Sequence, residues 1–185
     1  SLATALGSGA MTNSISGIAD SDVIFIIGSN TTEQHPLVAT RIYEALEINN
    51  AKLIVADPRK IPIAYKADYY LPLAPGTNLA LINAMLHVII AEDLVDANFI
   101  AERTEGFELL KASVADFTPE KAARITGLDA ELIRAAARLY GKAKQASILY
   151  AMGITQHVTG TKNCAALCNL AVITGNIGRP ATGVN

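Results

Sequence analysis

The sequence predicts an α/β fold of three layers, with helices on both sides of a mainly parallel sheet. Two observations carry this prediction. Four short apolar runs, at 23–27, 52–56, 69–73 and 147–150, alternate along the chain with helical patterns, and such alternation is typical of parallel sheets with right-handed crossovers. A polar or glycine-bearing turn also follows each run, at the strand ends where open α/β sheets bind ligands.

The first strand, Val23–Ile27, is a continuous apolar run, as expected for a strand buried on both faces. Before it we expect a glycine-punctuated loop over 1–11 and a short helix over 12–19. After it a helix begins at Pro36, a residue favoured at the first helical position. Its apolar residues fall on one stripe: Val38, Ile42, Ala45 and Leu46.

The second strand, 52–56, is ended by Asp57-Pro58, because the residue before proline is restricted. A helical turn over 62–66 leads to the third strand. Thr77 or Asn78 can cap the next helix, which runs to about residue 92 and is apolar nearly all round. We therefore expect that helix at the centre of the fold.

Residues from about 95 to 145 are more charged and lack a strand pattern, which indicates a helical insertion between the third and fourth strands. Thr118-Pro119, Gly127 and Asp129 mark helix ends inside it. A last helix follows the fourth strand, over 163–174. We interpret residues 1–185 as one Rossmann-like domain that includes this insertion.

The composition favours a globular protein. About half of the residues are apolar, and the formal net charge is −2, which gives no electrostatic reason to expect nucleic acid or a membrane surface as a partner. The longest apolar stretch, 79–91, is too short to span a bilayer. The chain has no initial methionine or targeting segment, so we expect an excised piece of a longer subunit, whose compartment its start does not reveal.

The two cysteines, Cys164 and Cys168, would share one face of the last helix. A disulfide within a regular helix is geometrically awkward, and a metal site would need further ligands nearby. We therefore interpret both as small buried residues.

The turns after the first three strands could bind a nucleotide. Gly28 allows close approach of the backbone, and the groups of Ser29 and Asn30 could hold a pyrophosphate, although the sequence lacks G-x-G-x-x-G. Asp57 could accept hydrogen bonds from a ribose or from the guanine edge, and Arg59 could bind phosphate. For each turn a purely structural role, such as helix capping, is a real alternative.

Of the three histidines, only His157 is placed for chemistry. His157 follows the fourth strand, His35 precedes a helix start, and His87 lies in the apolar helix, where a core histidine is the simpler interpretation. No aspartate or nucleophile is evidently paired with His157.

Taken together, the turns resemble a known family, the molybdopterin bis-guanine-dinucleotide oxidoreductases, and within it the catalytic subunit of molybdenum- or tungsten-dependent formate dehydrogenases. The matching phrases cover the chain in order: GSGAMTN (7–13), IGSNTTEQHP (27–36), ADPRK (56–60), PGTN (75–78), AMLHVII (84–90), RTEGF (103–107), MGITQH (152–157) and TGNIG (174–178). RTEGF and GITQH point to the formate dehydrogenase branch.

The resemblance implies a cofactor-binding role for ten residues. Gly28, Ser29, Asn30 and His35 would lie at the dinucleotide phosphates, Asp57 and Arg59 at the ribose or guanine, Gly76 and Asn78 over the nucleotide, and Gly153 and Gln156 near the pterin. It implies no catalytic residue and no metal ligand in this chain.

For the parent subunit the resemblance implies a molybdopterin guanine dinucleotide cofactor with molybdenum or tungsten. It also implies formate as substrate, a 4Fe-4S cluster in another domain, and an iron–sulfur partner subunit for electron transfer. Three alternatives stay open: another enzyme of the family such as a nitrate reductase, a generic adenine-nucleotide module, and a non-catalytic interaction domain.

Overall fold

A single five-stranded parallel sheet, in the order β3-β2-β1-β4-β5, forms the centre of the molecule. The computed structural model describes residues 2–185, so Ser1, the first residue of the predicted N-terminal loop, lies outside the described residues. The strands are β1 (Val23–Ile27), β2 (Lys52–Ala56), β3 (Tyr69–Leu71), β4 (Ala146–Tyr150) and β5 (Gly183–Val184). The predicted α/β class and its four strands are confirmed, and β5 is an addition to them.

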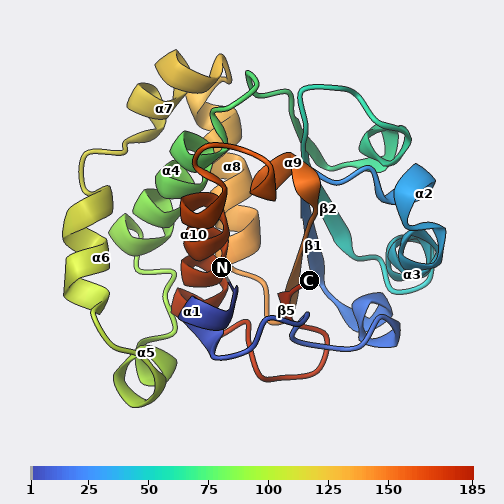
Figure 1. The fold of residues 1–185 in the computed structure, drawn as a ribbon, viewed down its shortest axis with the longest axis horizontal. Coiled ribbons are helices and arrows are strands. Elements are labelled where there is room, and N and C mark those ends of the chain that lie inside the picture. Colours follow the sequence, from blue (N-terminus) through green and yellow to red (C-terminus); the bar gives the residue numbers. More distant parts are fainter. Residues whose placement is uncertain (1) are drawn as a thin grey trace.

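Helices cover both faces of the sheet (Figure 1). Along β1, Val23, Phe25 and Ile27 point into one core, while Ile24 and Ile26 point into the other. The first core is shared with α4 (Asn78–Ala91), α8 (Ala130–Gly141) and α10 (Gly160–Ile173). The second is shared with α3 (Pro36–Glu47) and the short 3-10 helices η1 (Ser16–Asp20) and η2 (Pro62–Lys66). The three predicted layers are therefore present.

The region between β3 and β4 is helical, as predicted, and its helices join the larger core. After α4 come α5 (Ala97–Arg103), α6 (Phe107–Val114), α7 (Pro119–Thr126) and then α8. Val114, Ala122 and Ile133, one from each of the last three helices, are buried in the same cluster as β1.

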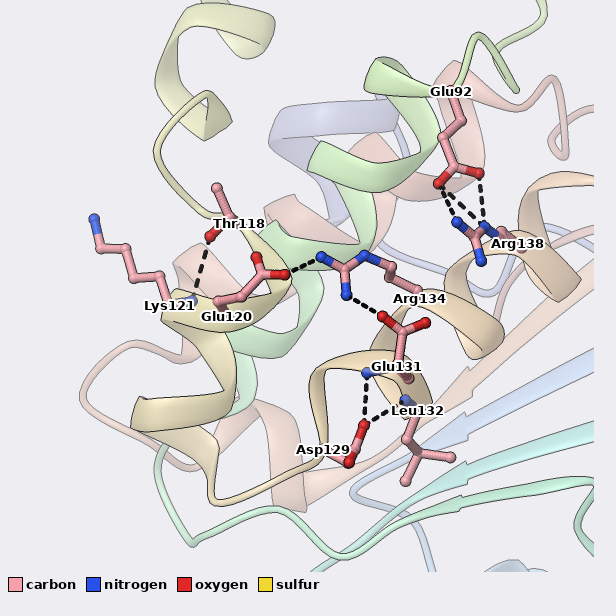
Figure 2. A network of polar contacts seen from close by, with 9 residues as sticks. All are labelled: Glu92, Thr118, Glu120, Lys121, Asp129, Glu131, Leu132, Arg134 and Arg138. Atoms are coloured by element: carbon pink, nitrogen blue, oxygen red, sulfur yellow. Dashed lines mark hydrogen bonds and ion pairs between the residues drawn. The ribbon is translucent and has the colours of Figure 1, made fainter.

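Polar contacts tie these helices to one another (Figure 2). Arg138 on α8 forms a two-pronged ion pair with Glu92 at the end of α4, with N–O distances of 2.8–3.1 Å. Arg134, one turn earlier, pairs with Glu120 on α7 and with Glu131 on its own helix. Helix α8 is thereby linked to both of its neighbours.

The N-terminal predictions were partly wrong. A helix, α1 (Leu2–Leu6), occupies part of the predicted loop, and the predicted helix over 12–19 is the shorter η1. Helix α1 packs on α10, so a tertiary contact stabilises a segment that is too short to be helical alone. Two further short helices, α2 (Thr31–Gln34) and α9 (Met152–Thr155), follow β1 and β4. Within residues 2–185, no helix has the length and apolar character needed to cross a membrane.

Candidate functional site: a cavity at the strand ends

The cavity of interest lies at the carboxyl ends of the strands, where β1 separates β2 on one side from β4 on the other. The chain leaves β1 toward β2 and returns later on the opposite side as β4, so this edge is the topological switch point, the usual ligand site of open α/β sheets. The cavity has a volume of about 550 Å³. Its lining is Gly28, Ser29, Asn30, Gln34, His35, Asp57, Pro58, Arg59, Pro75, Gly76, Asn78, Ala151, Met152, Gly153 and His157.

Two glycines from different strand ends meet in the floor of this cavity. The amide of Gly153 donates to the carbonyl of Gly28 at 3.1 Å. A Cβ built on Gly28 would lie 2.6 Å from the carbonyl carbon of Gly153, and one built on Gly153 would lie 2.6 Å from the carbonyl oxygen of Gly28. Gly28 also has φ +59°, a left-handed conformation that suits glycine. Only glycine fits at either position without moving backbone.

The turn after Gly28 leaves polar groups buried without partners. Ser29 is 5% exposed. Asn30 occupies the N-cap position of α2, yet its side chain caps nothing, and its Oδ1 is buried with no hydrogen-bond partner. The Oγ1 atoms of Thr31 and Thr32 are likewise buried and unpartnered. Because buried polar groups are normally paired, the side-chain oxygen of Asn30, a residue of the cavity lining, is suited to accept a hydrogen bond from a ligand.

Asp57 has a structural role in the turn after β2. Its Oδ1 accepts a hydrogen bond from the backbone amide of Arg59 at 2.8 Å, which closes the turn after β2. The carboxylate is mostly buried, 8% exposed. Burial raises the pKa of Tyr70 on β3, and the negative charge of Asp57 raises that pKa further. The turn thus holds the carboxylate in place at the cavity wall beside Arg59.

The third turn presents an uncapped helix end. Thr77 is the N-cap residue of α4, but its hydroxyl donates to the carbonyl of Ala74 at 2.6 Å, and no side chain caps the helix. Asn78, the first residue of α4, is 6% exposed and lines the cavity. The partial positive charge of this helix end is therefore available to an anion or to a base edge. Gly76, with φ +83°, has open space around it.

Nine of the ten residues singled out in the sequence line this one cavity, and Gln156 does not. The Gln156 amide instead donates to the sulfur of Met152 at 3.3 Å. Gln34, Met152 and His157 line the cavity but were not among the ten. All three lie within the phrases IGSNTTEQHP (27–36) and MGITQH (152–157) that carry the family resemblance, but no binding role was assigned to them.

Other candidate groups lie away from the cavity. His87 Nδ1 is 3.1 Å from the carbonyl oxygen of Val114, in agreement with the interpretation of a satisfied core histidine. Cys164 and Cys168 are free and buried, as expected. Over residues 2–185, no group of three or more histidine, cysteine, aspartate or glutamate side chains is arranged to hold a metal ion.

Comparison with known proteins identifies the family. The sequence model of the family described as molybdopterin oxidoreductase matches residues 3–185. The chain belongs to the molybdopterin oxidoreductase family. It is 58% identical over 184 residues to subunit alpha of F420-dependent formate dehydrogenase 1 from Methanococcus maripaludis, an alignment that covers 100% of this chain and 27% of that relative.

Two further similarities agree. Formate dehydrogenase H of Escherichia coli is 48% identical over 180 residues, which are 97% of this chain and 25% of that protein. The solved structure of acetylene hydratase from Pelobacter acetylenicus matches with a TM-score of 0.78 at 31% identity, over 90% of this chain and 25% of that one. The chain therefore spans about a quarter of the length of the relatives it matches.

Family membership implies a molybdopterin cofactor with molybdenum or tungsten. The cavity fits part of such a group on three grounds. Asn30 offers a buried, unpartnered carbonyl oxygen, Gly28 and Gly153 form a floor that a Cβ would fill, and the uncapped end of α4 can receive a negative charge. These features are compatible with a ligand that carries negative charge and hydrogen-bond donors.

Proposed function

We propose that this chain holds the guanine dinucleotide part of the molybdopterin cofactor in a formate dehydrogenase. The observation that carries the proposal is the convergence of four strand-end turns on one cavity at the switch point of a molybdopterin oxidoreductase. The named relatives with the highest identities support the formate dehydrogenase branch.

The proposed roles follow the chemistry of each turn. Gly28, Ser29, Asn30 and His35 would bind or border the phosphates, and Gly76 with Asn78 would close over the nucleotide. Asp57 has one oxygen engaged by the amide of Arg59, so its second oxygen can accept from a ribose hydroxyl or from the N–H edge of guanine. Arg59 would offer its planar fork to phosphate. Gly153 and Gln156 would lie toward the pterin.

We propose that the parent subunit converts formate to carbon dioxide and passes the electrons to an acceptor through a 4Fe-4S cluster and an iron–sulfur partner subunit. The metal and its pterin supply the redox chemistry when bound. The residues of this chain would bind and orient the cofactor and exclude water from its phosphates. We therefore expect no formate-dependent dye reduction by the 185-residue chain alone, and turnover by it would refute this division of labour.

Calorimetric titration with GDP and, separately, with ADP tests the nucleotide proposal. We expect a preference for GDP of about tenfold, or ~1.4 kcal/mol, which Asp57→Ala and Asn78→Ala abolish. Asp57→Asn is a matched control: its amide oxygen can still accept from Arg59, but one guanine-facing acceptor is replaced by a donor. We expect Asp57→Asn to retain wild-type stability and lose the preference.

The other outcomes distinguish the alternatives. A preference for ADP would favour a generic nucleotide-binding module. Binding of neither nucleotide, in the chain and in the cofactor-free parent alike, would favour an interaction domain. A nitrate reductase parent is the less favoured alternative because the relatives with that name are more distant, and reduction of nitrate without oxidation of formate by the parent would establish it.

A further inference from the structure

The two cysteines form a buried pair that has no part in the proposed nucleotide site. Cys164 and Cys168 lie one turn apart on α10 and are 4% and 1% exposed. The hydroxyl of Tyr150, at the end of β4, lies 3.2 Å from the sulfur of Cys164. They are the only two cysteines in the sequence, so any thiol chemistry of this chain belongs to them.

Open space reaches each cysteine from a different side. Cys164 and Tyr150 border a cavity of about 300 Å³ that Leu2, Gly9 and Thr161 help to line. Cys168 borders another, of about 830 Å³, between the N-terminal segment and α5. Each cysteine thus lines one cavity, although both side chains are largely covered.

The spacing of the pair suits a bridge of one atom between the sulfurs. Residues four apart on a helix have Cβ atoms about 5–6 Å apart, whereas a disulfide needs about 3.5–4.5 Å. A direct S–S bond would thus distort α10, while an S–X–S bridge spans the longer gap. No third histidine, cysteine or carboxylate completes a metal-binding group in the described part of the chain, which argues against the four-coordinate site that zinc prefers.

The surroundings favour a bridge that carries no charge. Burial, followed by the effect of Cys164, raises the pKa of the Cys168 thiol to about 12. Burial and the neighbouring Cys164 thiol also raise the pKa of Tyr150. A cuprous ion held by two thiolates would leave a net negative charge among apolar side chains, which is costly. A trivalent arsenical held by two sulfurs gives a neutral product.

We propose that Cys164 and Cys168 form a dithiol site that takes a small trivalent organoarsenical as a neutral one-atom bridge. In the reaction with methylarsonous acid, two S–H and two As–O bonds break and two As–S bonds form. The two hydroxyl groups leave with the two thiol protons as two molecules of water. Arsenic stays trivalent, so no oxidant or reductant is needed.

Native mass spectrometry of the 185-residue chain with methylarsonous acid, at about pH 7, tests the proposal. We expect one methylarsenic adduct per chain, the loss of both thiols from a thiol count, and a higher Tm, because a ligand bound only to the folded state stabilises it. Cys164→Ser and Cys168→Ser should each bind about 100-fold more weakly or worse, because the second attachment becomes unavailable.

Relocated pairs separate chelation from an effect on folding. In the Cys168→Ala background, Thr161→Cys places the second thiol three residues before Cys164, on the same helix face, and should restore the adduct. In the same background, Lys162→Cys places the second thiol two residues before Cys164, where the two side chains diverge. This variant should not restore the adduct. Tyr150→Phe should keep the adduct, since the phenol is not a ligand.

Three results would overturn the proposal. One is an adduct that forms equally well on the single-serine variants. Another is an adduct on the wild-type chain that appears only above its unfolding temperature. The third is binding that depends on Tyr150 and persists without either cysteine.

Discussion

The helices around the cavity and those of the insertion begin in different ways. In the insertion, the side chains of Asp96, Thr118 and Asp129 cap α5, α7 and α8, while α6 begins at Gly106 without a side-chain cap. Around the cavity, α2, α3, α4 and α9 have no side-chain cap. Side-chain caps are therefore found on most helices of the insertion and on none of the helices that begin at the cavity.

Ion pairs distinguish the two regions as well. Arg134 pairs with Glu120 and Arg138 with Glu92 in the helical region, whereas Asn30 in the cavity lining buries a side-chain oxygen that has no partner. Unpartnered buried atoms also occur outside the cavity lining, on Asn13, Thr31, Thr32, Tyr140, Asn163 and Asn185. Buried groups without partners cost stability, and such costs gather at functional sites. Caps and ion pairs thus support the insertion, whereas the helix ends at the cavity have no side-chain caps.

The largest expected effect is at the glycine contact. Gly28→Ala should lower the free energy of unfolding by about 2–4 kcal/mol, from a left-handed φ and overpacking against Gly153. Gly76→Ala is the matched control: its φ is also positive, but a Cβ there meets nothing within 4 Å. Urea unfolding of both variants measures the difference, and equal losses would show that the contact is not tight.

The next effect concerns a cap in the insertion. Asp129 accepts hydrogen bonds from the amides of Glu131 and Leu132, so Asp129→Ala should cost about 1 kcal/mol of stability. Its affinity for GDP should be that of the wild type. An affinity change in calorimetry without a stability change would contradict the division between the two regions.

A smaller effect depends on pH. The hydrogen bond and charge of Arg138 hold the pKa of Glu92 below its usual value of 4.5. A carboxylate with a lowered folded-state pKa stabilises the fold above its unfolded pKa, and this contribution is lost as the pH falls through the folded value. The free energy of unfolding of Glu92→Gln should therefore be about 0.5 kcal/mol lower than that of the wild type at pH 7. This difference should disappear as the pH falls below about 4. Thermal unfolding at several pH values measures this, and a constant gap would contradict it.

The smallest effect on stability is expected at Asn30. Asn30→Ala removes a buried oxygen that has no partner, so the stability of the unliganded chain should change by less than about 0.5 kcal/mol. Binding of GDP should nevertheless weaken by about tenfold, because a hydrogen bond to the ligand is lost. A clear loss of stability with unchanged binding would place Asn30 among the structural residues.

Some features could be predicted from the sequence because their causes are local. Continuous apolar runs marked β1 and β2, proline and glycine marked helix ends, and Thr118 and Asp129 were recognisable as caps. The parallel sheet follows from the alternation of strands and helices. Nine of the ten residues that the family resemblance indicated line one cavity, because the ends of parallel strands share one edge of the sheet; their role in cofactor binding stays a prediction.

Tertiary structure decided the features whose causes lie far apart in the chain. β5 forms because Gly183 and Val184 pair with Ser147 and Ile148, and α1 forms against α10. Gly28 needs to be glycine because Gly153, far along the chain, lies against it. Two local contacts also departed from the expectation: the hydroxyl of Thr77 donates to the carbonyl of Ala74, and the Gln156 amide donates to the sulfur of Met152. Local sequence sets which conformations each segment prefers, but only packing between distant segments determines which polar groups remain free to bind.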